Sequence, residues 1–287
     1  MRIGIAVKPG LVEARDTLAE LEVWLRARGV DTVWTPEAAT LLSGSPAIVE
    51  RARLPIGADL VITLGGDGTL LAAAKAIAET PHDVPILAVN FGSLGFLTEI
   101  TRPEIFQSLD AIMNGRAAHD VRMMLTAVAA GTGRPPAAHM ALNDVVFSRT
   151  ALSRMIELAV SVGDQLVAAV KADGLIVATP TGSTAYNLAA GGPIVHPSMD
   201  AFILTPIAPH TLTNRPIVIP PEREVRVRPI GSNAGEIHVT IDGQTGFSLR
   251  EDDEIAITRA ARPLRLIRST TRSYFEVLRQ KLKWNER

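Results

Sequence analysis

Two kinds of hydrophobic periodicity divide this 287-residue sequence and limit the folds that it can adopt. Up to residue 115, short apolar runs alternate with segments of helical period. This alternation is typical of a parallel sheet whose strands are joined by crossover helices. The expected strands are 2–7, 32–34, 58–64 and 85–90, and the expected helices are 11–28, 70–79 and 103–114.

From residue 118 onward the period changes to two, as in the strict alternation of Val225-Arg226-Val227-Arg228. A long series of such segments predicts a β-rich domain. We expect a loop over 131–136, where Gly and Pro are frequent, and a helix over 273–284. The expected strands are 122–130, 141–148, 155–162, 165–172, 175–179, 224–229, 236–241, 254–258 and 264–267.

The change of period predicts two domains. An α/β N-terminal domain, with a parallel sheet and crossover helices, is expected over residues 1–117. A β-rich C-terminal domain is expected over 118–264, and the C-terminal segment 265–287 is expected to return and complete the first domain.

Composition excludes several classes of protein. The formal net charge is -1 and the pI is about 6.6, so the sequence offers no basic face for nucleic acid or for a membrane surface. Cysteine is absent, which excludes disulfides, thiolate nucleophiles and cysteine-ligated metals. No apolar run reaches the roughly 18 residues that a membrane span needs. We therefore expect a soluble cytoplasmic protein without nucleic-acid or membrane partners.

The most informative short segment is Gly65-Gly66-Asp67-Gly68-Thr69, between an expected strand and an expected helix. Glycines and a helix N-terminus suit a phosphate group, yet Asp67 would repel phosphate unless it has a task there. It could accept a hydroxyl proton during phosphoryl transfer or hold a metal ion. Alternatively, Asp67 only caps the helix and the glycines make a tight turn. Lys75 either reaches back toward phosphate or is solvated.

Other polar segments follow apolar strands. The turn 90–97 has glycines and could form a wall of the same site, or it could be a turn that buries two phenylalanines. Asn143-Asp144, Asp173-Gly174 and Asp242-Gly243 suit ribose or base recognition, and each is also compatible with an ordinary turn.

The segment 179–193 combines hydroxyl-bearing and small residues with Tyr186, which favours a ligand site over a plain loop. The six histidines show no metal-ligand spacing, and no Gly-x-Ser-x-Gly hydrolase motif occurs.

Taken together, Gly65–Thr69, Asn143-Asp144, Ala172–Gly174, Thr179–Leu188 and Asp242–Gln244 resemble the NAD kinase family in order and spacing. The resemblance implies transfer of the γ-phosphate of ATP to the 2′-hydroxyl of the adenosine ribose of NAD, giving NADP. It also implies NAD bound in a cleft between the domains, a homodimer or homotetramer, and Mg²⁺ or another divalent cation arriving with ATP. The family often has Glu where this chain has Asp144, so a carboxylic acid is present at this position in both.

The resemblance implies that Asp67 is the general base. The residues implied for the phosphate loop are Gly65, Gly66, Thr69 and Lys75. Those implied for NAD binding, besides Asp67, are Gly68, Asn143, Asp144, Arg154, Lys171, Asp173, Thr181, Thr184, Ala185, Tyr186, Asn187, Leu188, Ala189, Ala208 and Gln244.

Two other functions remain open at this point. Lipid and sugar kinases carry similar Gly-Gly-Asp-Gly loops, although the polar set around Asn143, Asp173 and Tyr186 favours a nucleotide. A non-catalytic NAD(P) sensor would use the same residues for binding, but it would have no use for Asp67.

Overall fold

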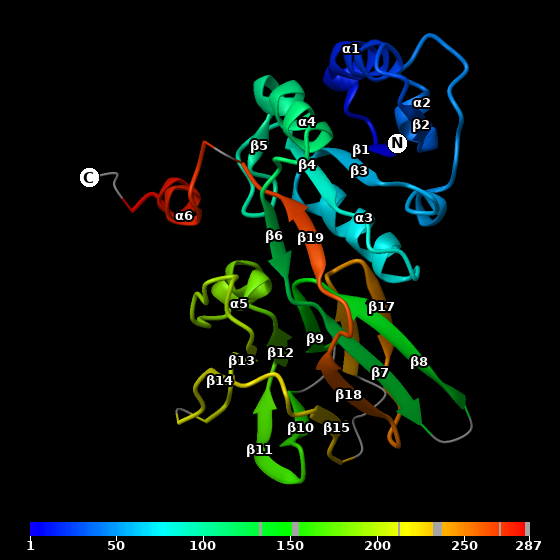
Figure 1. Cartoon of the computed structure of the whole chain (residues 1–287). Helices are drawn as coiled ribbons and strands as arrows, with labels where there is room; N and C mark the ends of the chain where they lie inside the picture. Colours follow the sequence, from blue (N-terminus) through cyan, green and yellow to red (C-terminus); the bar gives the residue numbers. More distant parts are fainter. Residues whose placement is uncertain (132–133, 151–154, 212, 232–236, 270, 285–287) are drawn as a thin grey trace. The chain divides into compact units, whose positions relative to one another are not determined.

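The structure is a computed structural model that describes residues 1–131, 134–150, 155–211, 213–231, 237–269 and 271–284 (Figure 1). The chain forms two compact units. Unit 1 comprises Met1–Val121 and Leu264–Arg287, and unit 2 comprises Arg122–Pro263. The C-terminal segment therefore belongs to the first unit.

Unit 1 contains a sheet of order β2-β1-β3-β4-β19-β6, with β5 beside β4. The pairs β1–β2, β1–β3, β3–β4, β4–β5 and β4–β19 are parallel, which confirms the predicted α/β class. The strands are β1 (Arg2–Val7), β2 (Asp31–Trp34), β3 (Leu60–Gly65), β4 (Ile86–Asn90), β5 (Ile100–Thr101), β6 (His119–Arg122) and β19 (Leu264–Ile267).

Helices connect these strands, and the longer ones bury apolar side chains against the sheet. The leucines of the helix α1 that follows β1, among them Leu18, Leu21 and Leu25, pack in one core with Ile3 and Ile5 of β1. In the described ranges, no helix combines the length and apolar composition needed to cross a membrane. The helices of unit 1 are η1 (Val12–Ala14), α1 (Arg15–Arg26), α2 (Pro36–Ala39), η2 (Arg51–Arg53), α3 (Asp67–Ala78), η3 (Arg102–Glu104), α4 (Ile105–Met113) and α6 (Tyr274–Leu282).

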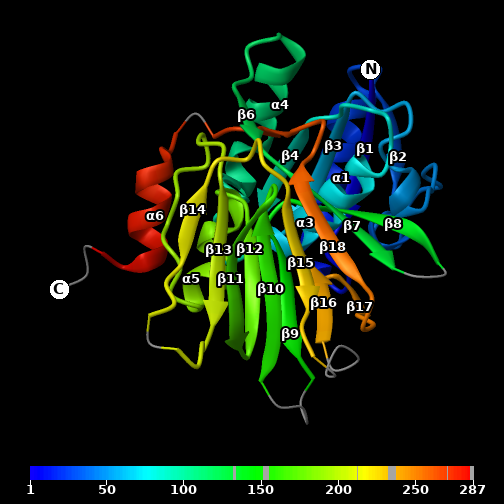
Figure 2. The same cartoon turned by 90° about the horizontal axis from the view of Figure 1, so that it is seen from below.

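Unit 2 has two six-stranded antiparallel sheets, whose strands run side by side up and down Figure 2. Side chains of both sheets, such as Leu158 and Val227 of one and Phe147 and Val177 of the other, share one apolar core. One sheet has the order β11-β10-β15-β18-β7-β8 and the other β14-β13-β12-β9-β16-β17.

The elements of unit 2 begin and end close to the predicted bounds where the alternation is clear. The strands are β7 (Leu125–Gly131), β8 (Arg134–Ala141), β9 (Asp144–Arg149), β10 (Ile156–Val162), β11 (Gln165–Ala172), β12 (Gly174–Ala178), β13 (Phe202–Ile207), β14 (Ile217–Ile219), β15 (Val225–Pro229), β16 (Ile237–Ile241), β17 (Thr245–Ser248) and β18 (Glu254–Arg259). Two short helices, η4 (Thr181–Thr184) and α5 (Tyr186–Ala189), follow β12.

Two sequence expectations were wrong. The stretch from Arg134 was expected to continue a loop, but it forms β8, which pairs with β7. Its two prolines are tolerated because β8 is an edge strand and because its register with β7 shifts between Ala129 and Gly131, where neither proline has a paired residue on β7. Residues 264–267 were counted among the strands of the β-rich set, although the domain expectation already assigned 265–287 to the first domain; β19 pairs in parallel with β4 of unit 1.

Candidate functional site

The glycine-rich loop lies at the carboxyl end of β3. Gly65 is the last residue of that strand, and Gly66 is the N-cap of α3. Gly65 has a φ of 159°, and a Cβ on it would lie 2.4 Å from Oγ1 of Thr69. Only glycine lets the chain turn this tightly from the strand into the first helical turn.

Asp67 is the first residue of α3, and it does not cap its own helix, which has no side-chain cap. Its carboxylate instead accepts four hydrogen bonds from residues 96–98. Oδ1 accepts the N–H of Leu97 at 3.2 Å and both the N–H and the hydroxyl of Thr98, at 3.1 and 3.0 Å. Oδ2 accepts the N–H of Phe96 at 3.0 Å. The capping interpretation is therefore wrong. Oδ2 accepts one hydrogen bond and Oδ1 accepts three.

The turn that follows β4 holds this carboxylate. Asn90 pairs with Gly65 in the sheet, and the N–H of Phe91 donates to the Gly65 carbonyl at 2.9 Å. The Asn90 amide donates to the Ser93 carbonyl at 2.8 Å and lies 3.1 Å from the Thr98 hydroxyl. The turn that the sequence suggested as a wall of the site thus contacts Asp67 directly.

Gly95 allows that contact. A Cβ at this position would lie 2.0 Å from Oδ1 of Asp67 and 2.3 Å from Oγ1 of Thr98. Any side chain at position 95 must displace the carboxylate or the turn that holds it.

Lys75, which was expected to assist phosphate binding, lies in the last turn of α3. Eight residues of helix separate it from Asp67, a rise of about 12 Å. Its Nζ lies 3.9 Å from a carboxylate oxygen of Glu79. The structure does not bring Lys75 to the glycine-rich loop.

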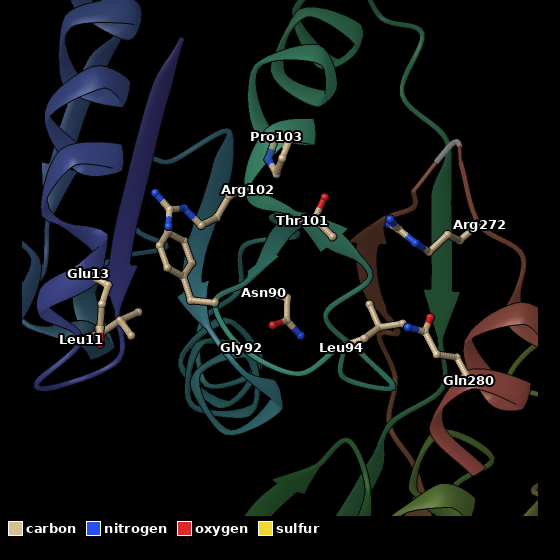
Figure 3. A pocket seen from close by; sticks show the side chains of 11 residues that line it. Leu11, Glu13, Asn90, Gly92, Leu94, Thr101, Arg102, Pro103, Arg272 and Gln280 are labelled. Carbon is tan, nitrogen blue, oxygen red and sulfur yellow. The ribbon is translucent and has the colours of Figure 1, made fainter. Parts of the chain in front are cut away.

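A pocket of about 580 Å³ opens beside the loop, at the carboxyl ends of β1, β4 and β5 (Figure 3). The chain after β1 forms one side of the pocket, and the C-terminal segment with α6 forms the opposite side (Figure 3). Its lining residues are Leu11, Glu13, Asn90, Phe91, Gly92, Leu94, Thr101, Arg102, Pro103, Arg272 and Gln280.

In unit 2, the turn that carries Asn143 and Asp144 is held by the carboxylate of Asp242. That carboxylate accepts the N–H of Leu142 at 2.8 Å, of Asn143 at 2.8 Å and of Asp144 at 3.1 Å. Asp242 lies in the β16–β17 hairpin with a φ of 50°, a conformation that Asp tolerates better than most residues. The hairpin interpretation of Asp242-Gly243 is correct, and the Asp242 carboxylate also holds the turn at Asn143-Asp144.

Asp144 itself is buried, with 4% of its surface exposed. Burial, followed by the nearby charge of Asp242, raises the pKa of Asp144 to about 7. Burial also raises the pKa of Asp242, and the three backbone hydrogen bonds oppose that rise. One site of unit 2 therefore holds two carboxyl groups with raised pKa values, of which Asp144 is buried and Asp242 is partly buried.

The hydroxyl-rich segment packs on the other side of the same turn. The N–H of Thr179 donates to the Asn143 carbonyl at 2.9 Å, and its hydroxyl donates to the Leu142 carbonyl at 2.6 Å. A Cβ on Gly182 would lie 2.1 Å from the Asn143 carbonyl oxygen, so glycine is required for this approach. The structure thus brings the two predicted motifs of unit 2 together.

Within that segment, Asn187 and Tyr186 differ in environment. Asn187 is buried, donates to the carbonyls of Ser183 and Pro193 at 3.0 and 3.1 Å, and accepts the hydroxyl of Thr205 at 2.6 Å. These bonds fix α5 against β13. Tyr186, in contrast, has 47% of its surface exposed.

Asp173 and Lys171 lie at the end of β11. Arg149 donates its Nε–H to Asp173 at 2.8 Å, and the Lys171 Nζ lies 2.5 Å from Glu157 across the β10–β11 pair. Ala208, just past β13, has a φ of 44°.

The remaining predicted residues lie around these. Thr181 and Thr184 are in η4, Ala185, Leu188 and Ala189 lie in or next to α5, Gln244 is in the β16–β17 turn and Gly68 is in the first turn of α3. Arg154 lies outside the described residues.

Sequence reasoning missed two parts of the site. The donors to Asp67 are backbone groups of residues 96–98, which no side-chain motif identifies. The pocket draws on four separate segments of the chain, so no local pattern marks it. Gly95 was a usable signal, because glycines in a turn at a strand end mark places of close approach.

Comparisons with known proteins agree over nearly the whole chain. The family model for the ATP-NAD kinase N-terminal domain matches residues 3–117, and that for the ATP-NAD kinase C-terminal domain matches residues 142–269. The NAD kinase of Geobacter sulfurreducens is 44% identical over 286 residues, covering 100% of this chain and 99% of the relative. The NAD kinase of Solibacter usitatus is 44% identical over 284 residues, covering 99% and 98% of the two chains.

Solved structures show the same similarity. A yeast NADH kinase complexed with NADH has a TM-score of 0.90 at 26% identity, covering 100% of this chain and 89% of its own. An Archaeoglobus fulgidus NAD kinase in complex with ATP has a TM-score of 0.77 at 26% identity, covering 99% of each chain. The sequence motifs, the two-unit fold and these matches lead to one conclusion: this chain belongs to the NAD kinase family.

Proposed function

We propose that this protein transfers the γ-phosphoryl group of ATP to the 2′-hydroxyl of the adenosine ribose of NAD, giving NADP and ADP. Membership of the family supports the reaction, and one observation on this chain carries it. A carboxylate, Asp67, stands at the mouth of a glycine-rich loop where phosphates bind, with Oδ1 held by three donors and Oδ2 by one.

In this proposal, Asp67 acts as the general base. The ribose 2′-oxygen attacks the γ-phosphorus, its proton passes to Oδ2 of Asp67, and the bond from the γ-phosphorus to the β,γ-bridging oxygen breaks. The three donors to Oδ1 fix the orientation of the carboxylate. Oδ2 is therefore already oriented when the 2′-hydroxyl binds.

Mg²⁺ enters as part of the donor, Mg-ATP, and offsets the charge of the phosphates beside Asp67. Mg²⁺ is commonly held by one or two carboxylates together with substrate phosphates, so the phosphates of ATP can supply most of its ligands.

Unit 2 supplies the proposed contacts to NAD. The turn at Asn143-Asp144 is rigid, because Asp242 and Thr179 bond it from two sides, and a rigid turn suits recognition of a ribose or an adenine edge. Exposed Tyr186 offers a ring on which a base can stack. We assign the ion pair of Arg149 and Asp173, whose Nε and Oδ1 atoms are 2.8 Å apart, to the nicotinamide end. We further propose that the protein is cytoplasmic and forms a homodimer or homotetramer. Light scattering of the purified protein tests the oligomeric state.

The experiment that tests the reaction is incubation of purified protein with Mg-ATP and NAD, with NADP measured by an NADP-specific dehydrogenase. Parallel reactions replace NAD with diacylglycerol or with a hexose. NADP formation with no transfer to lipid or sugar is the expected result. NAD binding without NADP formation would indicate a sensor, and transfer to lipid or sugar alone would indicate another kinase.

A further inference from the structure

We propose that Arg272, in the C-terminal segment, is a positioning residue for Asp67: it holds the chain at Glu99, directly after the donors that orient the Asp67 carboxylate. Phosphoryl transfer then depends on a side chain near the C-terminus that does not touch Asp67 itself. The inference rests on the proposed function, in which Asp67 is the general base, and it adds the part of the chain that keeps this base oriented.

The sheet alone holds the donors to Asp67 by few bonds. Phe96, Leu97 and Thr98 are followed by β5, which has two residues and pairs in parallel with the end of β4. A ladder of two residue pairs supplies few hydrogen bonds. Side-chain contacts from other segments therefore contribute much of what fixes residues 96–99 in place.

Arg272 makes such contacts at the end of the turn. Its Nη1 donates to the carbonyl oxygen of Glu99 at 3.0 Å and lies 2.9 and 3.2 Å from the two carboxylate oxygens of Glu104. Glu104 in turn accepts the N–H and the hydroxyl of Thr101, the last residue of β5, at 2.8 and 2.5 Å. Figure 3 shows the Arg272 side chain directed from the C-terminal segment toward Thr101. These bonds fix the backbone that directly follows the turn.

The ion pair that anchors Arg272 stays charged near neutral pH. Burial raises the pKa of Glu104, but hydrogen bonds from Thr101, Thr271 and Arg272 outweigh this effect and lower the pKa to about 2. The side chains of Arg272 and Glu104 are 29% and 16% exposed, so solvent screens the pair less than it screens a fully exposed one. Charge-assisted hydrogen bonds of this kind are stronger than neutral ones.

A second side chain of the C-terminal segment meets the other end of the turn. The Nζ of Lys281 in α6 lies 5.6 Å from the ring centre of Phe96, whose N–H donates to Oδ2 of Asp67. A cation at this distance is attracted to the face of the ring. Ser273 closes a capping box at the start of α6, directly after Arg272, so both cations project from one well-defined element. The C-terminal segment therefore contacts the turn on both sides of the donors to Asp67.

Arg265 offers a matched control, because it makes the same kind of contact away from the turn. Its Nε donates to Oδ1 of Asp83 and its Nη2 donates to the Asp83 carbonyl, both at 2.9 Å. It too joins the C-terminal segment to the rest of unit 1. If such bonds only stabilise the fold, Arg265→Met and Arg272→Met have equal effects, whereas a positioning role predicts a loss of turnover for Arg272→Met alone.

The experiment compares these two variants with wild type by steady-state kinetics and by amide hydrogen exchange followed with NMR. We expect Arg272→Met to lower kcat about tenfold with the KM for NAD unchanged, because the base loses orientation while the proposed NAD contacts in unit 2 remain. The N–H groups of Leu97 and Thr98 should exchange about tenfold faster, because their bonds to Asp67 open more often. Arg265→Met should match wild type in all three quantities.

Arg272→Lys adds a rescue test. All three contacts of Arg272 come from one nitrogen, so a lysine ammonium can restore part of them and should recover part of kcat and of the amide protection. Equal kcat and exchange rates in Arg272→Met and Arg265→Met would overturn the inference, and so would a rise in the KM for NAD that accounts for the whole loss. If Arg272→Met does not fold, Arg272→Lys is compared with Arg265→Lys and the same outcomes decide.

The exchange measurement separates this inference from the proposed function. Faster exchange in Arg272→Met, together with a wild type that forms no NADP, would contradict the proposed function and leave the positioning role standing. NADP formation by wild type, together with unchanged exchange in Arg272→Met, would contradict the positioning role and leave the proposed function standing.

Discussion

Thr98 binds Asp67 twice: its N–H and its hydroxyl both donate to Oδ1, at 3.1 and 3.0 Å. The two residues are 31 positions apart in the sequence, and the turn after β4 brings them together. The proposed general base is thus oriented by both the backbone and the side chain of a residue in the turn after β4.

The first prediction concerns the Thr98 hydroxyl. Thr98→Val keeps the shape and removes one donor, so the carboxylate loses part of its orientation and kcat falls about tenfold. The KM for NAD stays near that of wild type, because the contact is made to the base and not to the substrate. Thr98→Ser restores the hydroxyl and should restore kcat. A Thr98→Val enzyme with wild-type kcat would show that this bond does not orient the base.

The second prediction concerns Gly95. Gly95→Ala places a Cβ 2.0 Å from Oδ1 of Asp67, so the carboxylate or the turn has to move by about an ångström. A displacement of this size at a catalytic group costs about a hundredfold in rate. Steady-state kinetics measures the loss, with Gly44→Ala as control. Equal kcat values for the two variants would contradict the close approach.

The third prediction concerns the Asp242 carboxylate. Asp242→Ala leaves the N–H groups of Leu142, Asn143 and Asp144 without their acceptor, and the free energy of unfolding should fall by about 2–4 kcal/mol. Asp242→Asn keeps one acceptor oxygen and tolerates the positive φ, so its loss should be smaller. Urea unfolding measures both, with Asp164→Ala, an exposed turn aspartate, as control. A stable Asp242→Ala protein with an unchanged KM for NAD would refute this role.

The fourth prediction concerns pH. The pKa of Asp144 is raised by burial and by Asp242 from 3.8 to about 7 in the folded protein, so the folded state binds a proton that the unfolded chain releases. Its contribution to stability is present below about pH 4 and decreases as the pH rises to about 7. A difference of one between the folded and unfolded pKa values changes the free energy of unfolding by about 1.4 kcal/mol.

Asp144→Asn removes this titration. Urea midpoints of the variant should decrease less between about pH 5 and about pH 8 than those of wild type. Asp242→Asn should also flatten the profile, because it removes the charge that helps to raise the pKa of Asp144. Parallel pH profiles for wild type and Asp144→Asn would contradict the raised pKa.

The sequence allowed the fold class to be predicted because periodicity reports burial. The helical period of residues 15–26 and the alternation of Val225–Arg228 correspond to α1 and β15. The beginning of strand β8 was missed because its prolines suggest a loop, and only its place at a sheet edge, with a register shift at the prolines, makes them acceptable. The run 264–267 was counted with the β-rich strands because pairing partners are set by tertiary structure, which a short apolar run does not encode.

The candidate site was predictable where a side chain acts within a local motif. Asp67 in its glycine loop and Asn143-Asp144 beside Thr179–Gly182 belong to this group. The backbone donors of residues 96–98 and the long-range task of Asp242 were not predictable, since each links segments that are distant in sequence. Asn187 is different again, because it belongs to a predicted motif and its side-chain amide is hydrogen-bonded to other residues of unit 2.

The most direct test of the central claim is NADP formation by Asp67→Asn beside wild type. Asparagine keeps an oxygen for the three donors that meet Oδ1, but it cannot accept the ribose proton at the other position. We predict that NAD binding, measured by calorimetry, stays within a few-fold of wild type, while kcat falls by about a hundredfold or more. Wild-type turnover in Asp67→Asn would contradict the account.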